Sequence, residues 1–379
     1  MKKQTNRIVL LFLIALFFLL SANTASALTP LQKKLNAVIH KAQTQFNINS
    51  VSLAVLLPGK TKPETFVAGT IARNDSSPIS ATTLFKVGSI TKTYTATLIA
   101  KAIEENKLSL TDPLGKYLPQ YPKWKQITVS ELVNQTSGIL DYDKTPHWWK
   151  NLVTYHGKVW TAKELVQLAY NSPAQFPPGQ GWAYSNTNYI LLGMIVEKVF
   201  NTHIPKLMNK LISRASLTHT FYYPTNNNKI RARLAHGYFM NRFDETTPNE
   251  SWLRTAGAIV STPSEMCTWM KTLFTKKVIP GLPISQYFDF IDTKTGKAAT
   301  KDTTLSYSFG VFKRQTPEGM IYFTPGLTSG YVSMMVYVPG LDTYFAYSVS
   351  KAPIPGFHDF MLSHILKILQ QSTAIKSDP

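Results

Sequence analysis

The sequence predicts an α+β protein in which an antiparallel sheet is flanked by helices from both ends of the chain. Alternating apolar runs occur at residues 51–57 and 65–72, and again at intervals between 305 and 349. Apolar residues spaced three and four apart precede the first of these runs and follow the last. The region between holds helical patterns and polar loops, which predicts a helical subdomain inserted into the sheet.

Residues 1–27 have the three parts of a secretory signal peptide. Lys2, Lys3 and Arg7 precede the uninterrupted apolar run Ile8–Leu20, and Ala25-Ser26-Ala27 provides small residues for cleavage. An uncleaved membrane anchor is the alternative, which we rank second because the apolar run is too short for a comfortable span. We therefore expect an exported protein, periplasmic or secreted, with no transmembrane span after cleavage.

The chain is basic, with a formal net charge of +19, of which the first 27 residues contribute three cations. The lysines are scattered, and no nucleic-acid recognition motif is present, so nucleic acid is not an expected partner. Attraction to an anionic cell envelope is a physical hypothesis for such a charge. The single cysteine, Cys267, lies in a helical apolar pattern and is expected to be a buried structural thiol.

The first half of the chain after residue 27 predicts one helix, two strands and a series of further helices. The turn between the strands begins at Pro58-Gly59-Lys60. Thr161 and Glu164 have the spacing of a capping box at the start of a helix. The predicted helices are 29–46, 89 to about 106, 128–133, 161–170 and 188–200.

The second half predicts a helix, a return to strands, and a closing helix. The predicted helices are 263–274 and 357–371, and the predicted strands are 305–313, 320–323, 331–338 and 343–349. We expect one domain over 28–379. Its sheet part would be formed by about 28–88 and 261–379, and the helical insertion by about 89–260.

The segment Val87–Thr93 carries Ser89 and, three positions later, Lys92. On a helix these two side chains lie one turn apart on one face, so the amine can reach the hydroxyl. A serine hydroxyl becomes a good nucleophile when a base takes its proton, and a neutral lysine amine can be that base. The same spacing recurs at Ser348 and Lys351, where the pattern indicates the end of a strand and predicts no site.

Tyr184-Ser185-Asn186 is the second candidate segment. A tyrosine hydroxyl has a pKa of about 10 in water, so it acts as a base only where a cation such as Lys92 favours the phenolate. Asn186 offers an amide donor for a substrate carbonyl and an acceptor that can hold the lysine. The alternative is a turn in which Ser185 or Asn186 caps the following helix.

Several segments, in their order along the chain, are similar to the serine β-lactamase-related, penicillin-binding-protein-like family. This family includes class C β-lactamases, D-alanyl-D-alanine carboxypeptidases and esterases. The resemblance covers nearly all of the chain after residue 27 and rests on Leu84–Thr93, Lys107–Pro113, Tyr117–Pro119, Ile127–Gly138, Pro178–Gly179, Tyr184–Asn186, Leu191–Gly193 and Thr255–Thr262.

The resemblance implies a β-lactamase/transpeptidase-like fold with the active site in the cleft between sheet and helices. It implies that an amide or ester substrate acylates Ser89 and that water later releases the acyl group. Lys92 and Tyr184 would share the proton transfers, and Asn186 would contact the substrate. The oxyanion hole would use the backbone N–H of Ser89 and one from the strand that carries the third family motif.

That third motif is where the sequence departs from the family. The spacing back from Gly330-Tyr331, and forward to Val338-Pro339, fits the spacing in the family. It places Thr324-Pro325-Gly326 where the family has Lys-Thr-Gly or His-x-Gly. We expect Thr324, Gly326 and Leu327 to contact the substrate, with Leu327 providing the second oxyanion N–H. Pro325 would be tolerated on an edge strand that faces the cleft. The missing cation favours broad ester or amide substrates over those recognised through a carboxylate.

Two function classes remain open: an exported acyl-enzyme hydrolase and a non-catalytic module that binds a cell-wall peptide or a penicillin-like ligand. Retention of Ser89, Lys92, Tyr184 and Asn186 favours the hydrolase, which would act on a small-molecule or peptide substrate. No cofactor and no metal is expected, since the histidines show no paired metal spacing. His236 and Arg254 flank loops that can approach the cleft, and a structural role is the default for both. Gln135 and Glu265 also replace a histidine and an aspartate of the family, which we treat as second-order.

Overall fold

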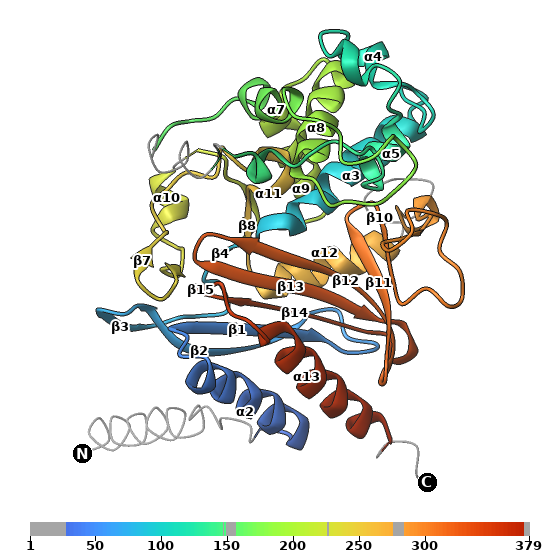
Figure 1. Cartoon of the computed structure of the whole chain (residues 1–379). Coiled ribbons are helices and arrows are strands. Elements are labelled where there is room, and N and C mark those ends of the chain that lie inside the picture. Colours follow the sequence, from blue (N-terminus) through green and yellow to red (C-terminus); the bar gives the residue numbers. More distant parts are fainter. Residues whose placement is uncertain (1–27, 147, 149–156, 226, 276–283, 375–379) are drawn as a thin grey trace, which may run out of the picture.

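A nine-stranded antiparallel sheet forms the centre of the molecule (Figure 1). The structure is a computed structural model that describes residues 28–146, 148, 157–225, 227–275 and 284–374. The strand order is β3-β2-β1-β14-β13-β12-β11-β10-β9, so strands from the two ends of the chain meet at the β1–β14 pair. The predicted signal peptide, residues 1–27, lies outside the described residues.

The strands of the central sheet come from both ends of the described chain. Their bounds are β1 Ser50–Leu56, β2 Glu64–Ala72, β3 Asp75–Pro78, β9 Ile291–Asp292, β10 Leu305–Ser308, β11 Val311–Thr316, β12 Gly319–Thr328, β13 Tyr331–Val338 and β14 Thr343–Val349. The sheet of an α+β protein, predicted from two separated groups of strands, is confirmed.

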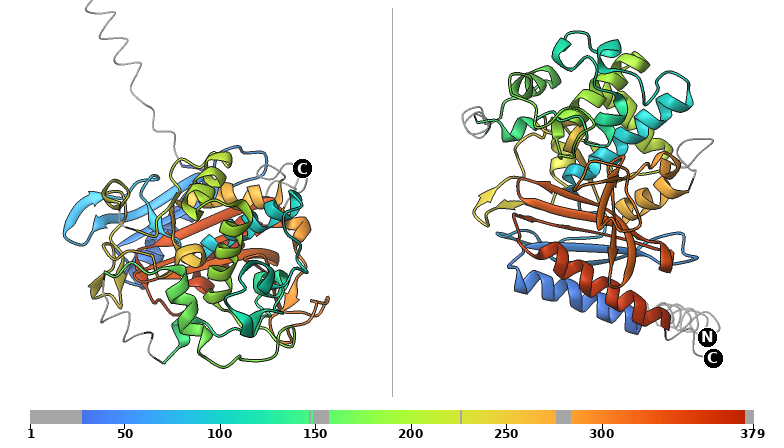
Figure 2. Two further views of the ribbon diagram at one scale, coloured as in Figure 1. Left: turned by 90° about the horizontal axis from the view of Figure 1, so that it is seen from above. Right: turned by 45° about the vertical axis from the view of Figure 1, so that its right-hand side comes forward.

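Two helices cover one face of the sheet. Helix α2 (Pro30–Gln45) and helix α13 (Phe357–Ala374) lie side by side below the strands (Figures 1 and 2). Successive strand residues alternate between the two faces. In β13, for example, Met334 and Val336 pack toward α2 and α13, whereas Met335 belongs to the core on the opposite face.

The opposite face is covered by helix α12 (Pro263–Phe274) and, above it, by the helical part of the molecule (Figure 1). Cys267 lies on α12, is fully buried, and donates its thiol to the Ala54 carbonyl oxygen. The other α-helices of the described residues are α3 Thr91–Glu104, α4 Leu114–Tyr117, α5 Val129–Val133, α7 Ala162–Tyr170, α8 Asn186–Phe200, α9 Ile204–Arg214, α10 Asn228–Arg231 and α11 Arg254–Gly257.

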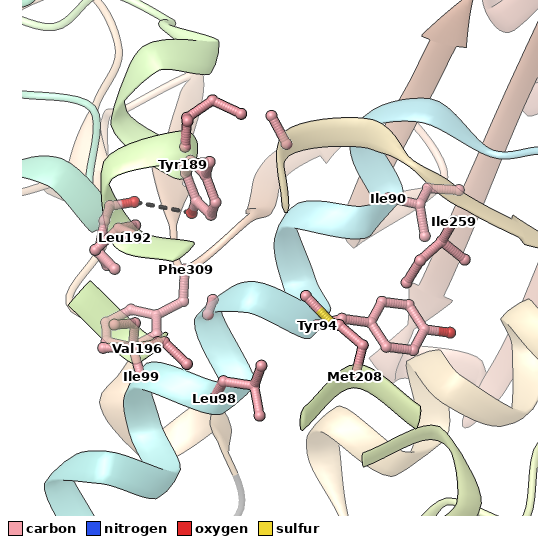
Figure 3. Packing of buried hydrophobic residues seen from close by; sticks show 14 of the residues in the cluster. Ile90, Tyr94, Leu98, Ile99, Tyr189, Leu192, Val196, Met208, Ile259 and Phe309 are labelled. Atoms are coloured by element: carbon pink, nitrogen blue, oxygen red, sulfur yellow. Dashed lines mark hydrogen bonds between the residues drawn. The ribbon is translucent and has the colours of Figure 1, made fainter. Parts of the chain in front are cut away.

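Helices α3 and α8 form the centre of the helical part. Figure 3 shows Tyr94, Leu98 and Ile99 of α3 in the same apolar cluster as Tyr189 and Leu192 of α8. Fourteen residues make up α3, and most of them are buried, polar threonines included. The helix is therefore held by tertiary contacts on nearly all sides, which fixes the position of anything at its start.

Two small three-stranded sheets connect the helical part to the central sheet. One has the order β4 (Phe85–Lys86), β8 (Ile259–Ser261), β5 (Phe221–Tyr222). The other has the order β15 (Lys351–Ala352), β6 (Tyr238–Phe239), β7 (Phe243–Asp244). We keep 28–88 with 261–379, and 89–260, as proposed boundaries of the sheet part and the helical insertion.

The predicted single strand 305–313 is wrong, because the chain reverses within it. Phe309 and Gly310 have φ values of 48° and 87°, and they connect β10 to β11 as a two-residue hairpin turn. The predicted strand 320–323 is too short, since β12 continues to Thr328. Among the helices of the described chain, none is long and apolar enough to cross a membrane.

Candidate active site

Ser89 lies at the junction between β4 and α3. The chain leaves β4, passes through Gly88 with φ +52°, and enters the short 3-10 helix η1 (Gly88–Ile90) that continues into α3. The N–H groups in the first turn of a helix lack partners inside the helix. The Ser89 N–H is therefore at a position where a backbone donor is available to an anion.

Two polar side chains meet at the Ser89 hydroxyl. The Tyr184 hydroxyl donates to Ser89 Oγ at 2.7 Å, and Lys92 Nζ lies 3.2 Å from the same oxygen. Tyr184 comes from the segment before α8, and Lys92 comes from the first turn of α3. The structure thus brings together the three residues that the sequence proposed for catalysis.

Lys92 makes two further contacts, to Asn186 Oδ1 at 2.6 Å and to the Ala256 carbonyl oxygen at 2.8 Å. Its side chain is 1% exposed, and this burial lowers the pKa of Lys92 to about 7. A neutral amine has two N–H donors and one lone pair. If Asn186 and Ala256 accept the two N–H groups, the lone pair is directed toward Ser89.

Asp141 and Asp143 complete the polar cluster, and neither was predicted from the sequence. The Asn186 amide donates to Asp141 Oδ2 at 3.1 Å and to Asp143 Oδ2 at 3.2 Å. Burial, and then the charge of Asp143, raise the pKa of Asp141 to about 7. Both carboxylates in turn act to raise the pKa of Lys92, against the larger effect of its burial.

These acidic residues carried one usable signal. They follow Thr136-Ser137-Gly138, a part of the family-like segment Ile127–Gly138, after only Ile139 and Leu140. Two carboxylates at alternate positions beside a candidate catalytic segment are candidates for electrostatic control of a nearby base.

Tyr184 is a phenol in this arrangement and not the phenolate that Lys92 was expected to favour. Burial, followed by the neighbouring Tyr307, raises the pKa of Tyr184 well above its ordinary value. Lys92 Nζ lies 4.7 Å from the centre of the Tyr184 ring, but its own pKa is lowered. The expectation of a phenolate base is thus corrected: Tyr184 donates a hydrogen bond to Ser89 Oγ, and Lys92 is the group that can accept a proton near neutral pH.

Gln135 holds the segment that carries Tyr184 and Asn186. Its side-chain oxygen accepts the Ser185 N–H at 3.1 Å and the Asn188 amide at 2.6 Å. Gln135 is fully buried, which makes these hydrogen bonds strong constraints on the start of α8. The residue that replaces a family histidine therefore has a defined supporting function.

Strand β12 forms the wall opposite the helices and lies directly against the turn before Ser89. A Cβ atom on Gly326 would come within 2.0 Å of the Val87 carbonyl oxygen, and one on Gly88 within 2.7 Å of the Leu327 nitrogen. Only glycine permits so close an approach of two backbones. The Leu327 backbone therefore lies beside Gly88 and next to Ser89.

Pro325 is accommodated for a reason that differs from the expected edge strand. β12 lies between β11 and β13, so it is not an edge of the sheet. Its pairing with β11 ends at Phe323, however, and from there one side of the strand is unpaired. Pro325 and Leu327 face that same side because they are two residues apart, so the missing N–H of Pro325 breaks no ladder bond.

Thr324 does not contact the cleft, which corrects its predicted part in substrate binding. Its side chain is buried, and its hydroxyl donates to the Gly310 carbonyl oxygen at 2.9 Å. The hydroxyl is thus used to hold the β10–β11 turn against β12. Gly326 and Leu327, by contrast, both line the cleft.

A cavity of about 640 Å³ opens in front of Ser89. Its described ionisable lining consists of Asp141, Asp143 and Lys144, together with His358, which is neutral near pH 7 because burial lowers its pKa to about 4. Much of the remaining wall is aromatic: Trp148, Trp182, Tyr184, Phe239, Trp252 and Phe312. The site therefore suits a substrate with an apolar group and without a large negative charge.

The other residues considered from the sequence lie away from this cavity. His236 forms a pair with Asp244, and Arg254 donates to the Trp160 carbonyl oxygen at 3.0 Å. Ser348, in the second Ser-x-x-Lys pattern, bonds Ser333 within the sheet, as a strand-end serine would. Across the residues that the structure describes, no three His, Cys, Asp or Glu side chains are arranged to hold a metal ion.

Comparison with known proteins identifies related sequences along almost the whole chain. Residues 35–370 match the family model described as Beta-lactamase. A penicillin-binding protein of Bacillus subtilis (strain 168) is 26% identical over 279 residues, which is 69% of this chain and 59% of that protein. A beta-lactamase of Pseudomonas fluorescens is 30% identical over 196 residues, which is 51% of each chain. The chain thus spans only between half and three fifths of these relatives' length.

Solved structures with the same fold match most of the described chain. A D-amino acid amidase from Ochrobactrum anthropi SV3, complexed with L-phenylalanine amide, superimposes with a TM-score of 0.77 at 21% identity. The match covers 91% of this chain and 100% of that one. A D-stereospecific amidohydrolase from a Streptomyces species matches with a TM-score of 0.75 at 22% identity, over 88% of this chain and 98% of the other.

Proposed function

The chain belongs to the Beta-lactamase family, and from this premise we propose that it is a serine hydrolase that forms an acyl-enzyme on Ser89. One observation carries the proposal. A buried lysine with a pKa near neutrality and a tyrosine phenol both contact the hydroxyl of one serine that lines a cavity. A serine placed between a base and a proton donor in this way is an activated nucleophile.

In the first step, neutral Lys92 takes the proton of the Ser89 hydroxyl as the oxygen attacks the substrate carbonyl carbon. A new C–O bond forms, and the carbonyl π electrons move to the oxygen. The backbone N–H groups of Ser89 and Leu327 would stabilise this oxyanion. Loss of one such donor typically costs about 100- to 1,000-fold in rate.

In the second step, the tetrahedral intermediate collapses and the bond to the leaving amine or alcohol breaks. The leaving group takes a proton from Tyr184, the hydroxyl closest to Ser89 Oγ. The proton that Lys92 received then restores the phenol. Water attacks the ester at Ser89 by the same groups in reverse order, which releases the acid and returns Ser89 to its starting form.

The substrate we propose is an ester or amide with an apolar or aromatic group and no essential carboxylate. The described cavity wall carries two carboxylates and one lysine, and β12 carries no cation at Thr324. An amide of an aromatic amino acid is a reasonable first compound, since the amidase of the same fold was solved with L-phenylalanine amide. D-Alanyl peptides and β-lactams remain the alternatives within the family.

We also propose that the protein is exported and acts in the periplasm or outside the cell. The support is the signal-peptide pattern of residues 1–27. Secretion of a reporter fused to these residues, and its loss when Ile8–Leu20 is interrupted by charges, would test this part separately.

The activity is tested by comparing p-nitrophenyl esters, L- and D-phenylalanine amides and nitrocefin, each with wild type and Ser89→Ala. The expected result is ester or amide hydrolysis that Ser89→Ala abolishes, with nitrocefin the poorest substrate. Hydrolysis that survives in Ser89→Ala would show that another group is the nucleophile.

The competing function is a non-catalytic module that holds a cell-wall peptide or a penicillin-like ligand in the cleft. The absence of a cation at Thr324 is the one observation in its favour. It predicts tight, reversible peptidoglycan binding with no turnover, and equal binding by wild type and Ser89→Ala.

A further inference from the structure

The two N–H groups of the proposed oxyanion hole belong to separate parts of the fold. Ser89 follows β4, whereas Leu327 lies on β12. Catalysis depends on the distance between the two donors, because a shift of about 1 Å can cost about 100-fold in rate. The glycine contacts between the two segments set only how closely they can approach. An attractive link is needed to hold them there.

A buried lysine lies on the first of these segments. Lys86, three residues before Ser89, is 1% exposed, and its ammonium donates three hydrogen bonds. The acceptors are the carbonyl oxygens of Glu245 at 2.7 Å and Pro248 at 3.0 Å, and Glu250 Oε1 at 2.7 Å. Every donor of the ammonium is thus used on one loop, 245–250.

The same carboxylate reaches the second segment. Glu250 is 2% exposed, and its other oxygen, Oε2, accepts the hydroxyl of Thr328 at 3.0 Å. Thr328 is the last residue of β12 and follows Leu327 directly. Lys86, Glu250 and Thr328 therefore form one continuous buried link between the strand before Ser89 and the strand of Leu327.

We propose that Lys86, Glu250 and Thr328 are positioning residues that hold the oxyanion-hole donors of Ser89 and Leu327 at their working separation. None of the three is a reacting group. This inference rests on the proposed acyl-enzyme function. A buried ion pair is by itself weak evidence for a contribution to stability. The inference therefore rests on which two segments the link joins, and not on the presence of the ion pair.

Thr328→Val is the test variant, because valine keeps the shape of the buried side chain and removes only the hydrogen bond to Glu250. The readout is the ratio of kcat/KM for a p-nitrophenyl ester to kcat/KM for its thiono analogue, in which C=S replaces C=O. Sulfur accepts hydrogen bonds poorly, so the ratio reports the oxyanion-hole donors. General loss of folded protein lowers both rates equally and leaves the ratio unchanged.

The expected result is a ratio about tenfold lower in Thr328→Val, mainly through kcat, and a value close to wild type in Thr328→Ser. Glu250→Gln should lower the ratio in the same direction, since one amide oxygen cannot serve both partners. Thr343→Val is the matched control. Thr343 lies on β14 and is buried, and its hydroxyl donates to the Leu341 carbonyl oxygen at 2.9 Å. The substitution removes this hydrogen bond. It should lower the thermal midpoint without changing the ratio.

Two outcomes would overturn the inference. One is an unchanged ratio in folded Thr328→Val and Glu250→Gln, and the other is an equal change in Thr343→Val. Failure of the proposed function itself would give a different result, in which wild type and Ser89→Ala hydrolyse the ester at the same rate. In that case the positioning role would be excluded as well.

Discussion

Lys92 is the side chain whose protonation decides whether Ser89 can be activated. Burial lowers the pKa of Lys92 to about 7, while Asp141 and Asp143 act to raise it. Asn186 joins the amine to both carboxylates by hydrogen bonds. The cluster therefore titrates as interacting groups, with apparent pKa values that belong to the set.

The pH dependence of acylation follows from this arrangement. The ammonium form of Lys92 has no lone pair to accept the Ser89 proton, so the rate is expected to rise as pH increases through about 7. Asp141→Asn removes a negative charge that raises the pKa of Lys92. The pH at which the acylation rate rises should then be lower, by up to about one pH unit. Stopped-flow acylation by a p-nitrophenyl ester measures the profile.

Asp302→Asn is the control for that experiment, because Asp302 is exposed and lies outside the cavity lining. It should leave the profile where it is in wild type. A rise that occurs at higher pH in Asp141→Asn than in wild type would contradict the electrostatic account of Lys92.

Tyr184 is predicted to act through its hydroxyl and not through its ring. Tyr184→Phe keeps the ring beside Lys92 and removes the group that donates to Ser89 Oγ. Loss of a general acid typically costs about 100- to 10,000-fold, and we expect a fall in kcat of that size. Because burial keeps the pKa of Tyr184 well above its ordinary value, the wild-type profile should show no decline caused by this phenol up to about pH 9.

Tyr121→Phe is the matched control, since the Tyr121 hydroxyl is buried and has no hydrogen-bond partner among the described residues. Its activity should equal that of wild type. A loss of activity in Tyr184→Phe no greater than that in Tyr121→Phe would remove Tyr184 from the mechanism.

At the scale of elements, the contact between β12 and the turn before Ser89 is the most restrictive in the site. Gly326→Ala would place a methyl group 2.0 Å from the Val87 carbonyl oxygen, so the strand must move away. We expect activity to fall at least about 100-fold, in line with the sensitivity of near-attack geometry. Steady-state kinetics and thermal unfolding of the purified variant measure both consequences.

Gly340→Ala provides the comparison, because no atom of the residues that the structure describes lies within 4 Å of a Cβ at that position. This variant should retain wild-type activity. If Gly326→Ala were equally active, the close approach of β12 could not be part of the site.

The elements also show what a sequence pattern can and cannot predict. The helix that begins after Thr161 was predicted from its capping box, and the structure contains both hydrogen bonds of that box. The hairpin at Phe309-Gly310 was missed because an aromatic residue with positive φ is not a usual turn signal. Local chemistry predicts local structure; the conformation of Phe309 depends on tertiary contacts.

At the scale of the whole molecule, the sheet built from both ends of the chain was predicted from alternating patterns and from the family resemblance. The same reasoning proposed Ser89, Lys92, Tyr184 and Asn186 as site residues, and these four side chains form one hydrogen-bonded cluster. The link from Lys86 to Glu250 could not be predicted, since 164 residues separate the two and no periodicity joins them. The burial of the Thr324 side chain could not be predicted from the sequence either, because it depends on the β10–β11 turn.

The net charge of the molecule leads to a prediction about its surroundings. Subtracting the three cations of residues 1–27 from +19 leaves +16 on residues 28–379. Binding to vesicles with anionic lipids should therefore weaken steeply between about 0.1 M and 1 M salt, where the Debye length falls from about 10 Å to about 3 Å. Neutral vesicles are the control, and salt-independent binding would contradict an electrostatic origin.

The central claim is that Ser89 is the residue that becomes acylated. Mass spectrometry of the protein and its peptides after brief exposure to a fluorophosphonate probe or an activated ester tests it most directly. We expect one adduct, on the peptide that contains Ser89, which forms faster above pH 7 than below it and is absent from Ser89→Ala. An adduct on a different residue, or none while a family member labels under the same conditions, would contradict the account.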